Sequence, residues 1–187
     1  MNYLFDLDGT LVDSSPAHAA AFRQAFEQHW PIAGFDYETA KGKRTADVFT
    51  ELGAPPELLN HLVATKQSAY RELVRQGRII LMPGARDLLE ALSAQGERMF
   101  LVTSGSRRSV AEVLETTGIR RYFEGIVTSD DVARAKPAPD IYLACIERFD
   151  LKPEDCLVIE DAESGFASAR AAGLRAVELQ EVACSAL

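Results

Sequence analysis

Short apolar runs and helix-like repeats alternate along the second half of the chain. Four runs have the length and composition of buried strands: residues 98–103 (RMFLVT), 125–128 (GIVT), 155–160 (DCLVIE) and 175–179. Between them, apolar residues recur at helical spacing and predict helices over 85–94, 109–117, 139–149 and 164–172. Strands that alternate with helices form a parallel sheet with helices on both faces. The pattern therefore predicts an α/β fold with a Rossmann-like parallel sheet.

The first eighty residues follow a different pattern. An apolar run at residues 3–5 is expected to be a strand of the same sheet, whereas residues 15–80 show only helical spacing. Helices are predicted over 15–30, 45–52 and 57–76, with Ser15 and Thr45 as caps. We therefore expect two domains: a Rossmann-like core of residues 1–14 and 81–187, and an inserted α-helical domain of residues 15–80.

Composition narrows the class of protein. At 187 residues, with 47% hydrophobic and 26% charged residues, the chain has the composition of a soluble globular protein. Its net charge of −8 argues against nucleic acid or an anionic membrane surface as a partner. No apolar run approaches the ~18 residues of a membrane span, and no basic segment precedes an apolar one at the N-terminus. We expect a cytoplasmic protein that is a monomer or a weak homodimer.

The three cysteines are Cys145, Cys156 and Cys184, which are far apart and form no C-x-x-C pair. This spacing predicts neither disulfides nor a zinc site. We expect the first two to be small core residues and Cys184 to belong to the tail.

The segment FDLDGT, residues 5–10, places two acids at the end of an apolar run. In an extended strand, Asp6 and Asp8 point to the same side. Two carboxylates about 4 Å apart repel by roughly 4 kcal/mol at an effective dielectric near 20, so a cation or a proton is expected there. The same residues also fit a strand that ends in a polar turn at Asp8 and Gly9. On their own, these residues leave both interpretations open.

Polar residues also follow three other predicted strands. Thr103 and Ser104 end the second strand, Lys136 lies in the loop beyond the third, and the pair Glu160-Asp161 ends the fourth. Ligands bind outside the carboxyl ends of the strands in open parallel sheets. Singly, these residues fit a turn, a solvated cation and a helix cap. Together, at one edge of the sheet, they predict a ligand site.

Four motifs carry this constellation: FDLDGT, LVTSGS, KPAPD and EDAESG. They are similar to the motifs of the haloacid dehalogenase-like superfamily of phosphatases, with phosphoglycolate and sugar-phosphate phosphatases and beta-phosphoglucomutase as the members that the chain resembles. The likeness covers essentially the whole chain, and residues 15–80 look like the family's small cap domain. The resemblance implies a Mg²⁺-dependent phosphatase that acts on a small phosphorylated metabolite, such as a sugar phosphate or phosphoglycolate.

The resemblance also implies roles for the acids. Asp6 is expected to attack phosphorus and become an aspartyl-phosphate, while Asp8 protonates the leaving alcohol and then activates water. Mg²⁺ is expected on the carboxylates of Asp6 and Asp161 and on the backbone carbonyl of Asp8. Glu160 is expected to lie behind these ligands and to orient them.

Two further residues are expected, by the same resemblance, to bind the phosphate. Lys136 neutralises the phosphate and orients Asp6, and Ser104 donates a hydrogen bond to a phosphoryl oxygen. Thr103 is the alternative donor, because the pattern does not fix the end of the strand to one residue.

The helical insertion is expected to recognise the rest of the substrate. Lys41, Lys43 and Arg44 cluster in the segment AKGKRTAD, where the family's substrate-contacting loop would lie. These cations suit an anionic substrate, and Arg44 can pair bidentately with a carboxylate or a second phosphate. His18, on the first predicted helix, is a further candidate. A solvated basic turn and a packed or solvated histidine are the alternative interpretations.

Other classes fit the sequence less well. A dehalogenase of the superfamily has no acid two residues after the first aspartate, and a calcium-binding loop that begins at Asp6 needs glycine where Leu11 stands. A phospho-accepting receiver domain would signal without turnover. A receiver domain has no helical insertion, and its lysine comes after its last hydroxyl residue. Here the insertion is present, and Lys136 comes before the acid Asp161.

A sugar-phosphate mutase resembling beta-phosphoglucomutase stays open, because it shares the cap and all four motifs. His18 and Lys66 are suitable contacts for a sugar or for Asp8 in such an enzyme. Thr10, which follows Asp-Gly as in the commonest phosphatase form, favours hydrolysis instead.

Overall fold

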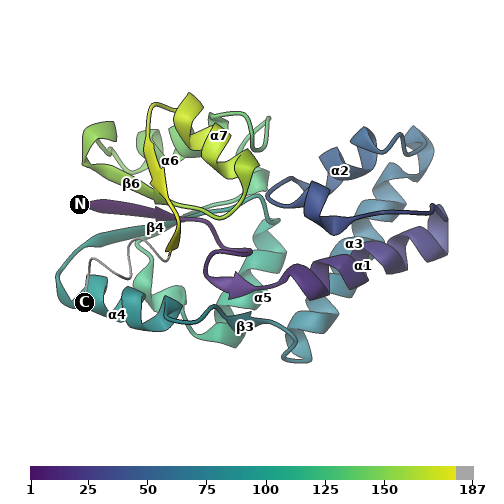
Figure 1. Cartoon of the computed structure of the whole chain (residues 1–187), viewed down its shortest axis with the longest axis horizontal. Helices are drawn as coiled ribbons and strands as arrows, with labels where there is room; N and C mark the ends of the chain where they lie inside the picture. The colour runs from purple at the N-terminus through teal and green to yellow at the C-terminus, as the bar shows by residue number, and fades with distance from the viewer. Residues whose placement is uncertain (180–187) are drawn as a thin grey trace.

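A five-stranded sheet forms the centre of the protein, whose computed structural model describes residues 1–179 (Figure 1). The strand order is β5-β4-β1-β6-β7, and all neighbouring strands pair in parallel. β1 is the central strand, with Leu4 paired to Phe100 of β4 on one side and to Val158 of β6 on the other. The strand bounds are Asn2–Phe5 (β1), Arg98–Val102 (β4), Gly125–Val127 (β5), Cys156–Ile159 (β6) and Arg175–Val177 (β7).

Helices cover both faces of this sheet. Side chains alternate between the faces of a strand, so Phe5 packs in one hydrophobic cluster with α4 and α5, and Leu4 in another with α6 and α7. Figure 1 shows the first pair of helices below the sheet and the second pair above it. Their bounds are Ala85–Ala94 (α4), Arg107–Thr117 (α5), Asp140–Arg148 (α6) and Glu163–Ala171 (α7). The predicted α/β fold with a parallel sheet is confirmed.

The N-terminal helical region contains α1 (Ser15–His29), α2 (Thr45–Glu51), α3 (Pro56–Arg75) and the 3₁₀ turn η1 (Tyr37–Ala40). Phe22, Phe26 and Phe49 belong to a hydrophobic cluster within this region. The second half of α3 instead packs against α5, and Tyr70 and Val74 belong to the same cluster as Phe5. The helical region therefore shares part of its packing with the sheet, and the division into two domains stays a prediction.

A short antiparallel ribbon joins the two regions, formed by β2 (Val12–Asp13) and β3 (Ile80–Leu81). The sequence pattern does not predict it, because two-residue strands are too short to show a period. The helix caps also differ from expectation by one residue. Ser14 precedes α1 and Arg44 precedes α2, so Ser15 and Thr45 are helical residues.

Three short 3₁₀ turns lie in the loops that flank β5 and β6: Arg120–Tyr122 (η2), Ser129–Asp131 (η3) and Pro153–Asp155 (η4). Cys145 and Cys156 are buried in the hydrophobic cluster that contains Leu4, whereas Cys184 lies outside the described residues. Within residues 1–179, no helix combines the length and the apolar character that a membrane crossing requires.

Candidate active site

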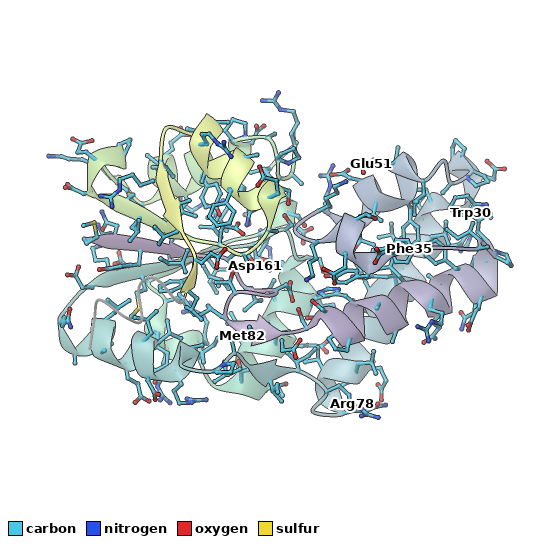
Figure 2. The ribbon with its side chains drawn as sticks, in the orientation of Figure 1. Trp30, Phe35, Glu51, Arg78, Met82 and Asp161 are labelled. Carbon is cyan, nitrogen blue, oxygen red and sulfur yellow. The ribbon has the colours of Figure 1, made fainter. Side chains whose placement is uncertain are left out.

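The residues singled out in the sequence come together at the carboxyl edge of the sheet. Asp6 follows β1, Thr103 follows β4, and the pair Glu160-Asp161 follows β6, which places them on three neighbouring parallel strands. Figure 2 shows Asp161 at the junction between the sheet and the helical region, whereas Trp30 lies toward the far end of the helical region. The site therefore lies where the two regions meet.

Lys136 connects two of the acids. Its Nζ donates to Oδ1 of Asp6 at 2.7 Å, to Oε1 of Glu160 at 2.5 Å and to the carbonyl of Val102 at 3.1 Å. Burial alone would lower the pKa of this lysine, but the charges of Asp6 and Glu160 outweigh burial and raise it. Burial raises the pKa of Asp6 well above its usual range, although the charge of Lys136 acts in the opposite direction.

Glu160 is held by several groups at once and is only 1% exposed. Its Oε1 also accepts a hydrogen bond from the Tyr142 hydroxyl at 2.7 Å, and its Oε2 accepts the backbone N–H of Asp161 at 3.3 Å. A Cβ atom on Gly165 would lie 2.0 Å from Cδ of Glu160, so a larger residue would displace the carboxylate. The glycine of the EDAESG motif is thus required by close packing against the first acid of the same motif.

Asp6, Glu160 and Asp161 form an acidic cluster in which the possible ligand oxygens all lie within 4.8 Å of one another. Burial and the charge of Glu160 raise the pKa of Asp161 to about 6. Thr10 Oγ1 donates to Oδ1 of Asp161 at 3.0 Å, and Gly9, at φ +93°, leaves room for the other oxygen. Crowded carboxylates favour a bound cation, and their hard oxygens suit Mg²⁺. The residues present therefore fit the predicted metal.

Asp8 is held by side chains of the helical region. Its Oδ1 accepts a hydrogen bond from the Tyr70 hydroxyl of α3 at 3.0 Å and lies 3.1 Å from Nε2 of His18 on α1. Nδ1 of the same histidine lies 2.7 Å from Nζ of Lys66 on α3. The ring of His18 also stacks on that of Tyr70, with 4.0 Å between centroids. Asp8, His18 and Lys66 thus form a continuous hydrogen-bonded chain.

Proton positions along this chain follow from donor and acceptor capacity. A carboxylate only accepts, so Nε2 of His18 carries the hydrogen that faces Asp8, and Nδ1 accepts from the Lys66 ammonium. Burial and the charge of Lys66 lower the pKa of His18, and burial lowers the pKa of Lys66 to about 8. Burial would raise the pKa of Asp8, but its interactions with His18 and Lys66 hold that pKa well below the usual range.

A cavity of about 50 Å³ lies between the sheet edge and the helical region. Asp6 and Asp8 line it from the sheet side, and His18 and Lys66 line it from the helical side. Further lining residues include Phe22, Tyr37, Lys43, Thr45, Gln67, Tyr70, Thr103 and Ser104. The cavity therefore combines carboxylates from the sheet region, cations from the helical region and hydroxyls from both.

The two candidate hydroxyls differ in their partners. Ser104 Oγ donates to the backbone carbonyl of Gly42 at 2.7 Å, so this hydroxyl connects the sheet to the loop before α2. Thr103 Oγ1 accepts the backbone N–H of Gly105 at 3.1 Å, and no acceptor within residues 1–179 takes its own proton. Both residues line the cavity, and which of them donates to a phosphoryl oxygen stays a prediction.

The cations of the loop before α2 also differ from one another. Lys41 and Lys43 each pair with a surface glutamate, and Lys43 lines the cavity. Arg44 does not line it: its guanidinium pairs with Asp47 at 2.8 Å and donates to the carbonyl of Ala133 at 3.2 Å. Arg44 therefore bridges the two regions, and this arrangement gives no support to the substrate contact expected from the sequence.

Sequence reasoning did not single out three tyrosines that shape the site. Tyr70 lies one helical turn after Lys66, and a polar pair at this spacing beside an apolar stripe is a signal that would have identified it. Tyr142 follows the KPAPD motif by two residues but reads as an apolar core position. Tyr37 stacks near His18, with 5.6 Å between centroids, from a 3₁₀ turn too short to show a period.

A family model described as haloacid dehalogenase-like hydrolase matches residues 3–179. This match includes all four motifs and both regions of the structure. The chain belongs to the haloacid dehalogenase-like hydrolase family. The superfamily inferred from the motifs is thereby confirmed.

Named relatives of this haloacid dehalogenase-like hydrolase include two curated proteins. Protein CbbY of Rhodobacter capsulatus is 36% identical, over 93% of this chain and 82% of that protein. Fructose-1-phosphate phosphatase YqaB of Escherichia coli (strain K12) is 33% identical, over 95% of each chain. A crystal structure of a CbbY mutant from Rhodobacter sphaeroides in complex with xylulose-(1,5)bisphosphate is 27% identical, with a TM-score of 0.83 over 94% of this chain and 84% of that one. The predicted enzyme class, a phosphatase of this superfamily, is confirmed.

Proposed function

We propose that the chain hydrolyses a small phosphomonoester of the sugar-phosphate type through an aspartyl-phosphate on Asp6. The observation that carries the proposal is that Asp6 lines a cavity together with Asp8 and is paired from behind with buried Lys136. Phosphoryl transfer uses all three groups: a nucleophile, a cation and an acid for the leaving oxygen. The relatives support the substrate class, because one is a fructose-1-phosphate phosphatase and another is described with a sugar bisphosphate.

The reaction has two halves. In the first, a carboxylate oxygen of Asp6 attacks phosphorus, the bond from phosphorus to the leaving oxygen breaks, and Asp8 gives its proton to the departing alkoxide. In the second, Asp8 takes a proton from water, the water oxygen attacks phosphorus, and the bond to Asp6 breaks. Inorganic phosphate leaves, and Asp8 again holds the proton with which it started.

Asp8 must therefore bind and release a proton within one cycle. The contacts from His18 and Lys66 favour its carboxylate form, which activates water in the second half. A substrate dianion in the cavity acts in the opposite direction, because a neighbouring negative charge raises the pKa of a carboxyl group. The chain of His18 and Lys66 thus sets the proton affinity of Asp8 from the helical region.

We propose Mg²⁺ as the cofactor. Asp6 and Asp161 would hold it with carboxylate oxygens, and Asp8 with its backbone carbonyl. Glu160 belongs behind them, because its Oε1 already accepts hydrogen bonds from Lys136 and Tyr142. When bound, Mg²⁺ supplies positive charge for the phosphate and for the crowded carboxylates.

A sugar-phosphate mutase is a second candidate, favoured by the His18–Lys66 pair beside Asp8. A mutase uses the same aspartyl-phosphate but must keep water away from it while a sugar reorients. The buried Lys66, at 4% exposed, and the small cavity suit that requirement as well. Product analysis separates the two candidates.

The test incubates the purified protein and Mg²⁺ with fructose 1-phosphate, beta-glucose 1-phosphate and phosphoglycolate, and follows products by phosphorus NMR. We expect inorganic phosphate from at least one sugar phosphate, and none with the Asp6→Asn variant. Glucose 6-phosphate that forms only with a trace of glucose 1,6-bisphosphate would identify a mutase. An absence of turnover across the panel would contradict both candidates.

A further inference from the structure

Tyr142 brings a hydroxyl to the back of the active site from inside the hydrophobic core. The residue lies on α6, has no exposed surface and packs among apolar side chains such as Phe100 and Val158. A phenol hydroxyl buried there without a partner would cost about 1–3 kcal/mol, whereas a phenylalanine would fill the same space without that penalty. The hydroxyl finds its partner in Oε1 of Glu160, at 2.7 Å.

The number of protons on Lys136 limits what this lysine can offer a substrate. A lysine ammonium has three, and they are donated to Asp6, Glu160 and the Val102 carbonyl. A phosphoryl oxygen therefore receives a hydrogen bond from Lys136 only when one of these acceptors gives up its own. Glu160 has other donors, the Tyr142 hydroxyl and the backbone N–H of the next residue.

We infer that Tyr142 is a positioning residue that supports Glu160 and thereby frees Lys136 to turn a proton toward the substrate phosphate. With the hydroxyl present, Glu160 keeps two donors after Lys136 shifts. Without it, this buried carboxylate would keep only the N–H of Asp161, at 3.3 Å, and would hold the lysine more tightly. The inference rests on the proposed phosphatase function, and Tyr142 itself does not touch the substrate.

The hydroxyl can be separated from the rest of the side chain. The Tyr142 ring lies 5.2 Å from Nζ of Lys136 and fills the core, so the Tyr142→Phe variant keeps the ring and removes only the hydrogen bond. Tyr122→Phe is the matched control, because the Tyr122 hydroxyl also donates to a glutamate, Glu90, but does so at the surface. Both variants are compared with the wild-type chain at a temperature where circular dichroism shows all three folded.

The experiment measures kcat and KM with Mg²⁺ on the best substrate of the panel, and the affinity for inorganic phosphate by isothermal titration calorimetry. For Tyr142→Phe we expect kcat/KM to fall about tenfold, the equivalent of one hydrogen bond to a charged group. The affinity for inorganic phosphate should fall several-fold as well. The Tyr122→Phe control should match the wild-type chain in both measurements.

Glu160→Gln tests the route by which Tyr142 acts. If the hydroxyl acts by weakening the hold of the Glu160 charge on Lys136, adding Tyr142→Phe to Glu160→Gln should lower kcat/KM by less than about twofold further, because the neutral amide no longer holds the ammonium. Independent, multiplicative losses would overturn the inference.

A lower melting temperature with unchanged kcat/KM and phosphate affinity in Tyr142→Phe would also overturn the inference, by showing a purely structural role. Failure of the proposed function has a different signature. The wild-type chain would then hydrolyse no member of the panel. The affinity for inorganic phosphate would still be lower in Tyr142→Phe than in the wild-type chain if the inference about Tyr142 holds.

Discussion

Asp6 and Asp8 are two residues apart in the chain but are served by different regions of the molecule. Asp6 pairs with Lys136, whose other acceptors also belong to the sheet region. Asp8 accepts hydrogen bonds from Tyr70 and His18, and both belong to the helical region. The contacts of Asp6 thus form within the sheet region, whereas those of Asp8 require the helical region to pack against the sheet.

This difference divides the chemistry. A nucleophile needs a fixed position and a neighbouring cation. The edge of the sheet fixes the position of Asp6, and Lys136 supplies the cation. An acid and base needs a proton affinity that changes during the cycle, and neighbouring groups from another element can set it. The comparison therefore predicts that substitution of Asp6 stops the reaction. Substitution of a residue that contacts Asp8 or its partners should slow the reaction and change the free energy of unfolding.

The largest effect is expected at the nucleophile. Asp6→Asn should lower kcat by on the order of a thousandfold or more while leaving the circular dichroism spectrum unchanged, because an amide does not form the acyl phosphate. Asp87→Asn, on the exposed surface of α4, is the control and should keep full activity. A variant at Asp6 that retains a few per cent of wild-type turnover would contradict the assignment.

Metal removal should have the next largest effect. The carboxylates of Asp6, Glu160 and Asp161 cluster within 4.8 Å, and a substrate dianion adds further negative charge to them. Excess chelator should therefore abolish turnover, and added Mg²⁺ should restore it. Ca²⁺ should restore little, because its looser coordination allows both Asp6 oxygens to bind the metal and to lose the line of attack. Full turnover in chelator would refute the metal proposal.

The Lys66→Met variant should disrupt the contacts that the helical region makes to Asp8, and it should leave the contacts of Asp6 intact. Loss of the donor to His18 should lower kcat by about ten- to a hundredfold, the size of effect seen when a residue that orients a working ligand is removed. Lys152→Met, at an exposed lysine in the loop between α6 and η4, serves as the control. Turnover equal to the wild-type chain would show that the His18–Lys66 pair does not support Asp8.

The same variant should change stability in a pH-dependent way. Burial lowers the pKa of Lys66 from 10.5 to about 8, so the fold is destabilised below pH 8, where the buried lysine is charged. Lys66→Met should therefore raise the free energy of unfolding at pH 7 by up to about 3 kcal/mol. The gain should shrink between pH 8 and 10.5, where the lysine is neutral in the folded chain. Urea unfolding at pH 7 and pH 10 measures both values, and an equal gain at the two would contradict the assignment.

The smallest effect is expected in the loop before α2. Arg44→Ala removes a contact between the regions and should raise KM a few-fold for every substrate in the panel, because it weakens packing and not recognition. Lys43→Ala, at the cavity, should instead change the ranking of substrates. A changed ranking in the Arg44 variant would support the direct substrate contact expected from the sequence.

The sheet region was predictable from sequence because its strands are apolar runs and its acids stand at their ends. Asp6, Lys136 and Asp161 could be placed at one edge because parallel strands end together. Other contacts between residues that lie far apart in the sequence could not be derived in this way. The contacts of Ser104 with Gly42 and of Tyr142 with Glu160 depend on how loops and helices pack against one another over long sequence separations, and the local spacing of apolar residues carries no information about that packing.

The register of β1 has a consequence for how the chain folds. Asn2 pairs with Arg98 on one side and with Cys156 on the other, so the central strand is completed by partners that are synthesised much later. Closing such long loops before any pairing is gained makes folding slow, and fragments that end before residue 156 lack one neighbour of the central strand. Nascent chains of increasing length should therefore show no partial activity, with turnover appearing only once β6 has left the ribosome.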